Sequence, residues 1–154
     1  MKKALILASF LALAALAFAA SGEQVYQTYC MSCHQANGKG ITGAFPPLVE
    51  EVPELIGKGD KGRAFLIDVV LFGLQGQITA GGGTFNGMMP GLGGSLKDAD
   101  VAAVLTYVAK AWGNDKKLPK GFKDFTQDEV AKERGKQLTP QQVYQLWKAL
   151  EAGK

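Results

Sequence analysis

The feature that most constrains this chain is the run Cys-Met-Ser-Cys-His at residues 30–34. It contains both cysteines and the only histidine among 154 residues. A Cys-x-x-Cys-His run is the attachment signature of a c-type haem, in which each thiol forms a thioether with one haem vinyl group. Two residues between the thiols let one helical turn span both vinyls. We therefore predict one covalent haem c, bound through Cys30 and Cys33, with His34 as an iron ligand.

Three other interpretations of the motif are weaker. A redox-active Cys-x-x-Cys pair expects a βαβ context, whereas the sequence around residues 30–34 indicates a helix followed by a glycine-rich loop. A structural zinc site needs four nitrogen or sulfur ligands, and two cysteines and one histidine supply three. A disulfide between Cys30 and Cys33 would leave His34 without a role.

The first 19 residues predict a signal peptide. Two lysines precede an apolar run over residues 4–18, and Ala17-Phe18-Ala19 fits the pattern of a cleavage site before Ala20. An uncleaved membrane anchor is the alternative, but the run is short for a span of about 20 residues. A periplasmic location also fits the motif, because haem attachment to thiols belongs outside the cytoplasm in bacteria. Cleavage leaves 15 basic and 14 acidic residues, a balance that does not predict binding to nucleic acid.

Apolar periodicity predicts a mostly helical chain, with a core domain over residues 20–114 and a C-terminal extension over residues 115–154. The expected core helices are 22–30, 53–56, 62–74 and 98–112, and the extension adds 127–136 and 140–152. Thr126 and Thr139 each begin a capping box for a helix of the extension. We expect these two helices to pack on the core. The glycine-rich stretch near 77–86 can form a short β-hairpin.

A second stretch offers a ligand for the opposite face of the haem. With one histidine in the chain, the remaining candidates outside the signal peptide are the thioethers of Met31, Met88 and Met89. Met31 lies between the two thiols and cannot cross the ring. Met88 and Met89 are expected on a flexible loop, where adjacent side chains point to opposite sides, so only one can bind. Pro90 restrains Met89 in an extended conformation; alternatively, both methionines pack on the haem edge.

The proline pair at residues 46–47 is rigid and cannot be helical. We expect this segment to offer a backbone carbonyl to the free ring nitrogen of His34, which would fix the tautomer and raise the basicity of the ligand. An ordinary loop is the alternative interpretation of the same residues.

Taken together, these residues resemble the class I monohaem cytochromes c. The resemblance covers residues 22–114 and rests on Gly22 and Tyr26, the haem motif, the segment 45–48, Met89-Pro90 and the helix around 103–108. The stretches 73–78, 111–113 and 138–143 are also similar to soluble members from thermophilic bacteria. Those members carry a C-terminal extension that wraps the back of the fold.

The resemblance implies an all-α class I cytochrome c fold around one haem, in which Gly22 and Tyr26 meet Tyr107 where the first and last core helices cross. It implies His34 and Met89 as axial ligands, with the Pro46 carbonyl as the partner of His34. It also implies a one-electron carrier rather than an enzyme. The donor would be a quinol-oxidising complex of a respiratory chain, and the acceptor a terminal cytochrome c oxidase.

We expect a periplasmic monomer without stable membrane insertion once the signal peptide is cleaved. A haem peroxidase or gas sensor is an alternative, but it would need an open iron and a polar distal group. A cytochrome subunit anchored in a larger complex is another, and it depends on whether the leader is kept. Residues 69–96 carry no charge. Partner docking is therefore expected to be mainly apolar, through an exposed Met88, Ile78 or Leu92.

Overall fold

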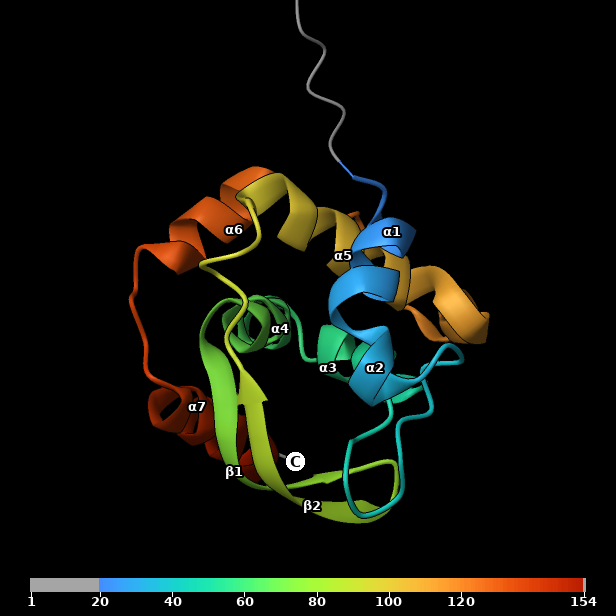
Figure 1. Ribbon diagram of the computed structural model, residues 1–154, viewed down its shortest axis with the longest axis vertical. Coiled ribbons are helices and arrows are strands. Elements are labelled where there is room, and N and C mark those ends of the chain that lie inside the picture. The colour runs from blue at the N-terminus through green and yellow to red at the C-terminus, as the bar shows by residue number, and fades with distance from the viewer. Residues whose placement is uncertain (1–19, 154) are drawn as a thin grey trace, which may run out of the picture.

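The computed structural model describes residues 20–153, so the predicted signal peptide lies outside the described residues. The elements are α1 (Gly22–Tyr29), α2 (Met31–His34), α3 (Glu51–Gly57), α4 (Asp60–Phe72), β1 (Gly73–Ala80), β2 (Gly83–Pro90), α5 (Asp98–Lys110), the 3₁₀ helix η1 (Ala111–Lys117), α6 (Gln127–Arg134) and α7 (Pro140–Ala152). Figure 1 shows one hairpin among helices, with α7 beside β1. The mainly helical fold with one hairpin is confirmed.

Helices α1 and α5 cross in close contact. The haem motif follows directly after α1. Ser21 caps α1 by accepting a hydrogen bond from the backbone N–H of Gln24. A Cβ atom on Gly22 would lie 2.1 Å from the carbonyl oxygen of Ala103, so only glycine permits this approach. The rings of Tyr26 and Tyr107 pack with their centroids 5.7 Å apart. The crossing that the resemblance implied is therefore present.

Helix α4 ends earlier than predicted, and the hairpin is longer. The predicted helix 62–74 was wrong at its end, because Gly73 has a φ of 83° and begins β1. The strands pair antiparallel from Gly73 opposite Pro90 to Ala80 opposite Gly83. Gly81 and Gly82 join them with φ values of 54° and 75°, as a tight primed turn requires.

The two methionines are consequently not on a flexible loop. Met88 and Met89 lie in β2, opposite Gln75 and Leu74 of β1. The expectation of a loop was wrong because glycines weaken the strand signal in the sequence, whereas backbone pairing with β1 continues as far as Pro90.

The C-terminal extension shares the hydrophobic core. Val130 of α6 and Val143 of α7 are both 0% exposed and belong to one cluster with Val101 of α5. The capping boxes at Thr126 and Thr139 are confirmed. Helix α6 ends at Arg134, two residues before its predicted end. The domain boundaries after residues 19 and 114 stay predictions.

Within residues 20–153, no helix combines the length and the hydrophobicity that crossing a bilayer requires.

Candidate haem site

The haem motif forms one helical turn after α1. The backbone N–H of Cys30 donates to the Tyr26 carbonyl over 2.9 Å, and that of His34 donates to the Cys30 carbonyl over 2.9 Å. Both cysteines are unpaired and half-buried. The chain therefore presents two thiols one turn apart, with the imidazole directly after them, which is the arrangement that the motif predicts.

The imidazole of His34 is buried, with 8% of the residue exposed. Its Nδ1–H donates to the Pro46 carbonyl oxygen over 3.0 Å. This bond fixes the proton on Nδ1 and leaves Nε2 as the nitrogen that can bind a metal. Burial lowers the pKa of His34, although the Pro46 bond acts in the opposite direction. The ring is therefore in the neutral form that ligates iron.

The environment of the Cys30 thiol disfavours its ionisation. Burial, together with the neighbouring Cys33, raises the pKa of the Cys30 thiol to about 11. A buried cysteine with a raised pKa is a poor nucleophile and a poor disulfide partner. For Cys30, this argues against a role in a thiol redox pair.

The hairpin separates the two candidate methionines. Neighbouring residues of a strand point to opposite faces. Met88 is 62% exposed, whereas Met89 is partly buried and packs against the core. Met31, between the thiols, is 37% exposed. Of the three thioethers, only Met89 is directed toward the interior, which favours it as the second ligand.

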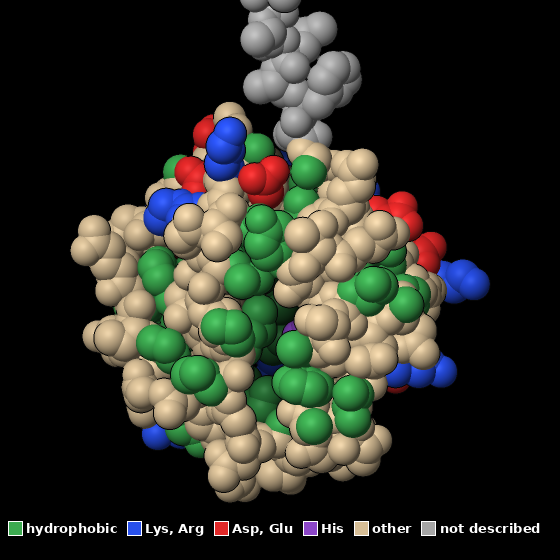
Figure 2. All heavy atoms as spheres, viewed as in Figure 1, with side chains coloured by type: hydrophobic (Ala, Val, Ile, Leu, Met, Phe, Trp, Pro, Cys, Tyr) green, Lys and Arg blue, Asp and Glu red, His purple; other side chains and the backbone are tan. Residues whose placement is uncertain are grey.

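Figure 2 shows that one face of the molecule is hollowed at its centre. Hydrophobic side chains line the hollow and a histidine is visible in it, and the chain has only His34. Most of the charged side chains in this view lie near the margin of the face. An apolar hollow, a neutral imidazole, two free thiols and an inward thioether fit the requirements of a haem c.

Residues that act through hydrogen bonds to the backbone were not found from the sequence. Asn114 is 1% exposed and holds the loop that follows Pro46. Trp112 donates from Nε1 to the Ala36 carbonyl over 3.0 Å. The helix predicted to run to Trp112 in fact ends at Lys110, and Trp112 adopts a φ of 55°. Gly113 marked the end of the helix, and the family resemblance covered residues 111–113, but neither signal indicated these hydrogen bonds.

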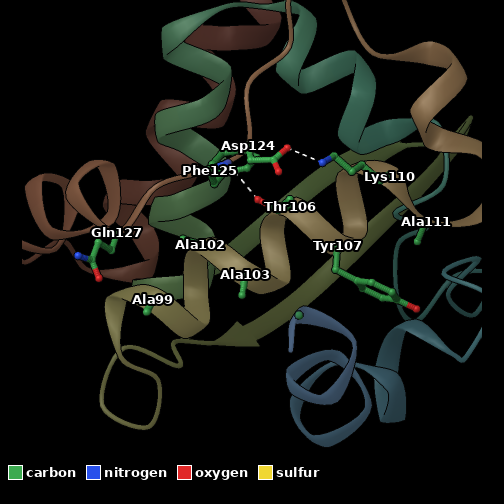
Figure 3. A pocket seen from close by; sticks show the side chains of 11 residues that line it. Ala99, Ala102, Ala103, Thr106, Tyr107, Lys110, Ala111, Asp124, Phe125 and Gln127 are labelled. Atoms are coloured by element: carbon green, nitrogen blue, oxygen red, sulfur yellow. Dashed lines mark hydrogen bonds and ion pairs between the residues drawn. The ribbon is translucent and has the colours of Figure 1, made fainter. Parts of the chain in front are cut away.

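A separate groove of about 720 Å³ lies along α5, between α1 and residues 124–127. Figure 3 shows that alanines of α5 line it and that Lys110 and Asp124 form an ion pair at its rim. No residue of the haem motif or of β2 lines this groove. It is therefore not part of the haem site.

The fold and the site together define a c-type cytochrome. Residues 19–112 match the cytochrome c family, and the chain belongs to this family. A cytochrome c-552 of Thermus thermophilus is 52% identical over 144 residues, which are 93% of this chain and 93% of the relative. A second cytochrome c-552 from that species is 53% identical, over 80% of this chain and 92% of the relative. A cytochrome c6 of a Picosynechococcus species is 31% identical, over 72% of this chain and 91% of the relative.

The comparisons confirm the resemblance to class I cytochromes c and to members from thermophilic bacteria. The protein carries one haem c, attached through Cys30 and Cys33. It is an electron carrier that works with redox partners, in a family whose members are generally exported and not enzymes.

Proposed function

We propose that the protein is a periplasmic one-electron carrier of a respiratory chain. It takes electrons from a quinol-oxidising complex and delivers them to a terminal cytochrome c oxidase, and residues 1–19 are its cleaved signal peptide. One observation carries the proposal: the chain offers a fixed, neutral imidazole at His34 and an inward-directed thioether at Met89. Two protein ligands to the iron would suit electron transfer rather than binding of a small molecule.

The roles of the site residues follow from this proposal. His34 would bind the iron through Nε2, and the Pro46 carbonyl fixes the tautomer and raises the basicity of the ring. Met89 would supply the second iron ligand, while Met88 stays at the surface. The haem supplies a ferrous–ferric couple, whose potential is raised by methionine–histidine ligation. With both ligands supplied by the chain, oxygen and peroxide would be kept off the iron.

The ligand assignment is tested with paired alanine substitutions. A ferric holoprotein with a bound thioether should show the weak near-infrared band of sulfur-to-iron charge transfer. We expect Met89→Ala to abolish this band and to let the ferrous protein bind carbon monoxide. Met88→Ala is the matched control, because it removes a neighbouring thioether from the outer face of the same strand. If Met88→Ala opens the iron and Met89→Ala does not, the assignment is wrong by one residue.

A further inference from the structure

Asn114 of η1 joins two segments that are far apart in the sequence. Its side chain is buried, and its Nδ2 donates to the carbonyl oxygens of Val108 over 2.9 Å and Leu48 over 3.2 Å. Its Oδ1 accepts from the backbone N–H of Glu50 over 2.8 Å. Both donors of the amide and its acceptor are therefore engaged. One side chain connects the end of α5 to the loop that carries Pro46.

The loop is held on both sides at Leu48. The N–H of Leu48 donates to the Gly38 carbonyl over 2.7 Å, and its C=O accepts from Asn114. Leu48 lies two residues after Pro46, and the intervening Pro47 has a fixed φ. A shift at Leu48 is therefore passed on to the Pro46 carbonyl, which lies 3.0 Å from Nδ1 of His34.

The other end of the loop is also held by η1. The indole N–H of Trp112 donates to the Ala36 carbonyl, and a Cβ atom on Gly38 would lie 2.4 Å from the Trp112 ring. Trp112 keeps a left-handed backbone conformation, which for a bulky residue persists only where the surroundings enforce it. Lys117 adds an ion pair with Glu50 over 2.6 Å.

We propose that Asn114 is a positioning residue for the iron ligand His34. By holding the backbone at Leu48 and Glu50, it keeps the Pro46 carbonyl at hydrogen-bonding distance from Nδ1 and thereby sets the reduction potential. This inference rests on the proposed ligation of iron by His34. A strong bond to Nδ1–H makes the ring more basic and favours the ferric state, so weakening the bond should raise the potential.

The test uses Asn114→Leu, which keeps approximate volume and removes all three hydrogen bonds. Asn114→Ser is the milder variant in case the first does not fold, because a hydroxyl is too short to serve all three partners. In both ferrous holoproteins we expect the His34 Nδ1–H to exchange with solvent about tenfold faster or more, as loss of one buried hydrogen bond predicts. The measured reduction potential should become more positive.

Val130→Ala is the matched control, because it destabilises the core through α6, which packs on α4 and α5, and Val130 makes none of the hydrogen bonds that hold the loop over residues 36–50. It should lower the thermal midpoint and leave both the exchange rate and the potential unchanged. If the Asn114 variants behave like this control, Asn114 is structural only and the inference fails. If the proton NMR spectrum of the wild-type ferrous protein lacks the large upfield shifts of imidazole ring protons that iron ligation produces, the proposed ligation by His34 is wrong, and the inference about Asn114 is wrong with it.

Discussion

At the scale of single residues, the most unusual side chain away from the haem site is Asp68 of α4. It is 0% exposed, and its Oδ2 accepts from Nζ of Lys136 over 3.2 Å. Glu133 is also buried and forms an ion pair with the same lysine. Burial raises the pKa of Asp68 to about 6, with Lys136 opposing and Glu133 adding to the shift. Two buried carboxyl groups thus share one lysine between α4 and the C-terminal extension.

The shifted pKa predicts a change of stability with pH. An acid whose pKa is higher in the folded protein holds its proton more tightly there. The stabilising contribution of protonated Asp68 is therefore fully present below its unfolded pKa of 3.8. It is lost as the pH rises to the folded pKa of about 6. Relative to wild type, Asp68→Asn should therefore gain stability as pH rises through this window. Denaturant unfolding at a series of pH values measures the difference.

Lys136→Gln provides the companion variant, because the lysine lowers the pKa of Asp68. Its removal should move the loss of stability to higher pH. Parallel stability profiles for wild type and Asp68→Asn between about pH 4 and pH 6 would contradict the assigned direction of the shift.

The residues with distinctive side-chain chemistry could be predicted from the sequence, and those that organise the backbone could not. One histidine and three thioethers outside the predicted signal peptide leave few candidate ligands, so His34 and the pair Met88 and Met89 stand out in the sequence. The preference for Met89 came from Pro90 and the family resemblance, and the assignment stays a prediction. Asn114 has no such signal, because its role depends on carbonyl groups 6 and 66 residues away that only the fold brings together.

At the scale of elements, the two helices of the extension were predicted well because their signals are local. In each helix, the side chain of the capping threonine and that of the polar N3 residue accept hydrogen bonds from each other's backbone N–H groups. The hairpin was predicted too short, since strand pairing is decided by a partner strand rather than by the residues themselves. Its continuation to Pro90 is what directs Met88 outward and Met89 inward.

Helix α7 stabilises the fold through one face, which predicts a contrast between two of its residues. Val143 is 0% exposed, whereas Leu146 is 38% exposed. Val143→Ala should cost about 1.5–3 kcal/mol through lost burial and a cavity. The thermal midpoint should then fall by roughly 6–12 °C, at about 4 °C per kcal/mol for a domain of this size. The reduction potential should stay at the wild-type value.

Leu146→Ala is the control on the same helix and should change the midpoint little. Calorimetry of both holoproteins, with potentiometry, makes the comparison. Equal losses from the two substitutions would mean that α7 is not docked through Val143.

At the scale of the whole molecule, charge is distributed unevenly. Residues 69–96 carry no charged side chain, whereas the extension over residues 115–154 has nine basic and six acidic residues. Met88 and Ile41 are exposed at 62% and 44%. Ile78 and Leu92, expected at the surface, instead pack partly buried against the core. Met88 is therefore the better candidate for an apolar contact with a redox partner.

Apolar docking predicts a weak dependence on salt. Oxidation of the reduced protein by the proposed acceptor, a terminal cytochrome c oxidase, can be followed in stopped flow. It should slow only modestly from low salt to about 0.15 M, where the Debye length is about 8 Å. Met88→Asp should slow the reaction about tenfold, as expected for losing a contact of about 1.4 kcal/mol. A steep dependence on salt would show that charged side chains steer the encounter instead.

Asn86→Asp is the matched control. Asn86 is exposed and lies two residues before Met88, on the same face of β2. The substitution adds the same charge without removing an apolar side chain, so it should slow the reaction much less. Equal losses from the two variants would point to charge repulsion and away from apolar contact.

The sharing of one core by both ends of the described chain has a consequence for folding. Lys58 donates to the Leu150 carbonyl 92 residues away, and Arg63 binds Glu129 66 residues away. Contacts of such long range slow folding, because loops must close before the contacts form. Arg134 also donates to the carbonyl groups of Gly93 and Leu96, shortly after Met89. The core begun by α1 is thus completed only when α6 and α7, which leave the ribosome after α1 to α5, have docked on it.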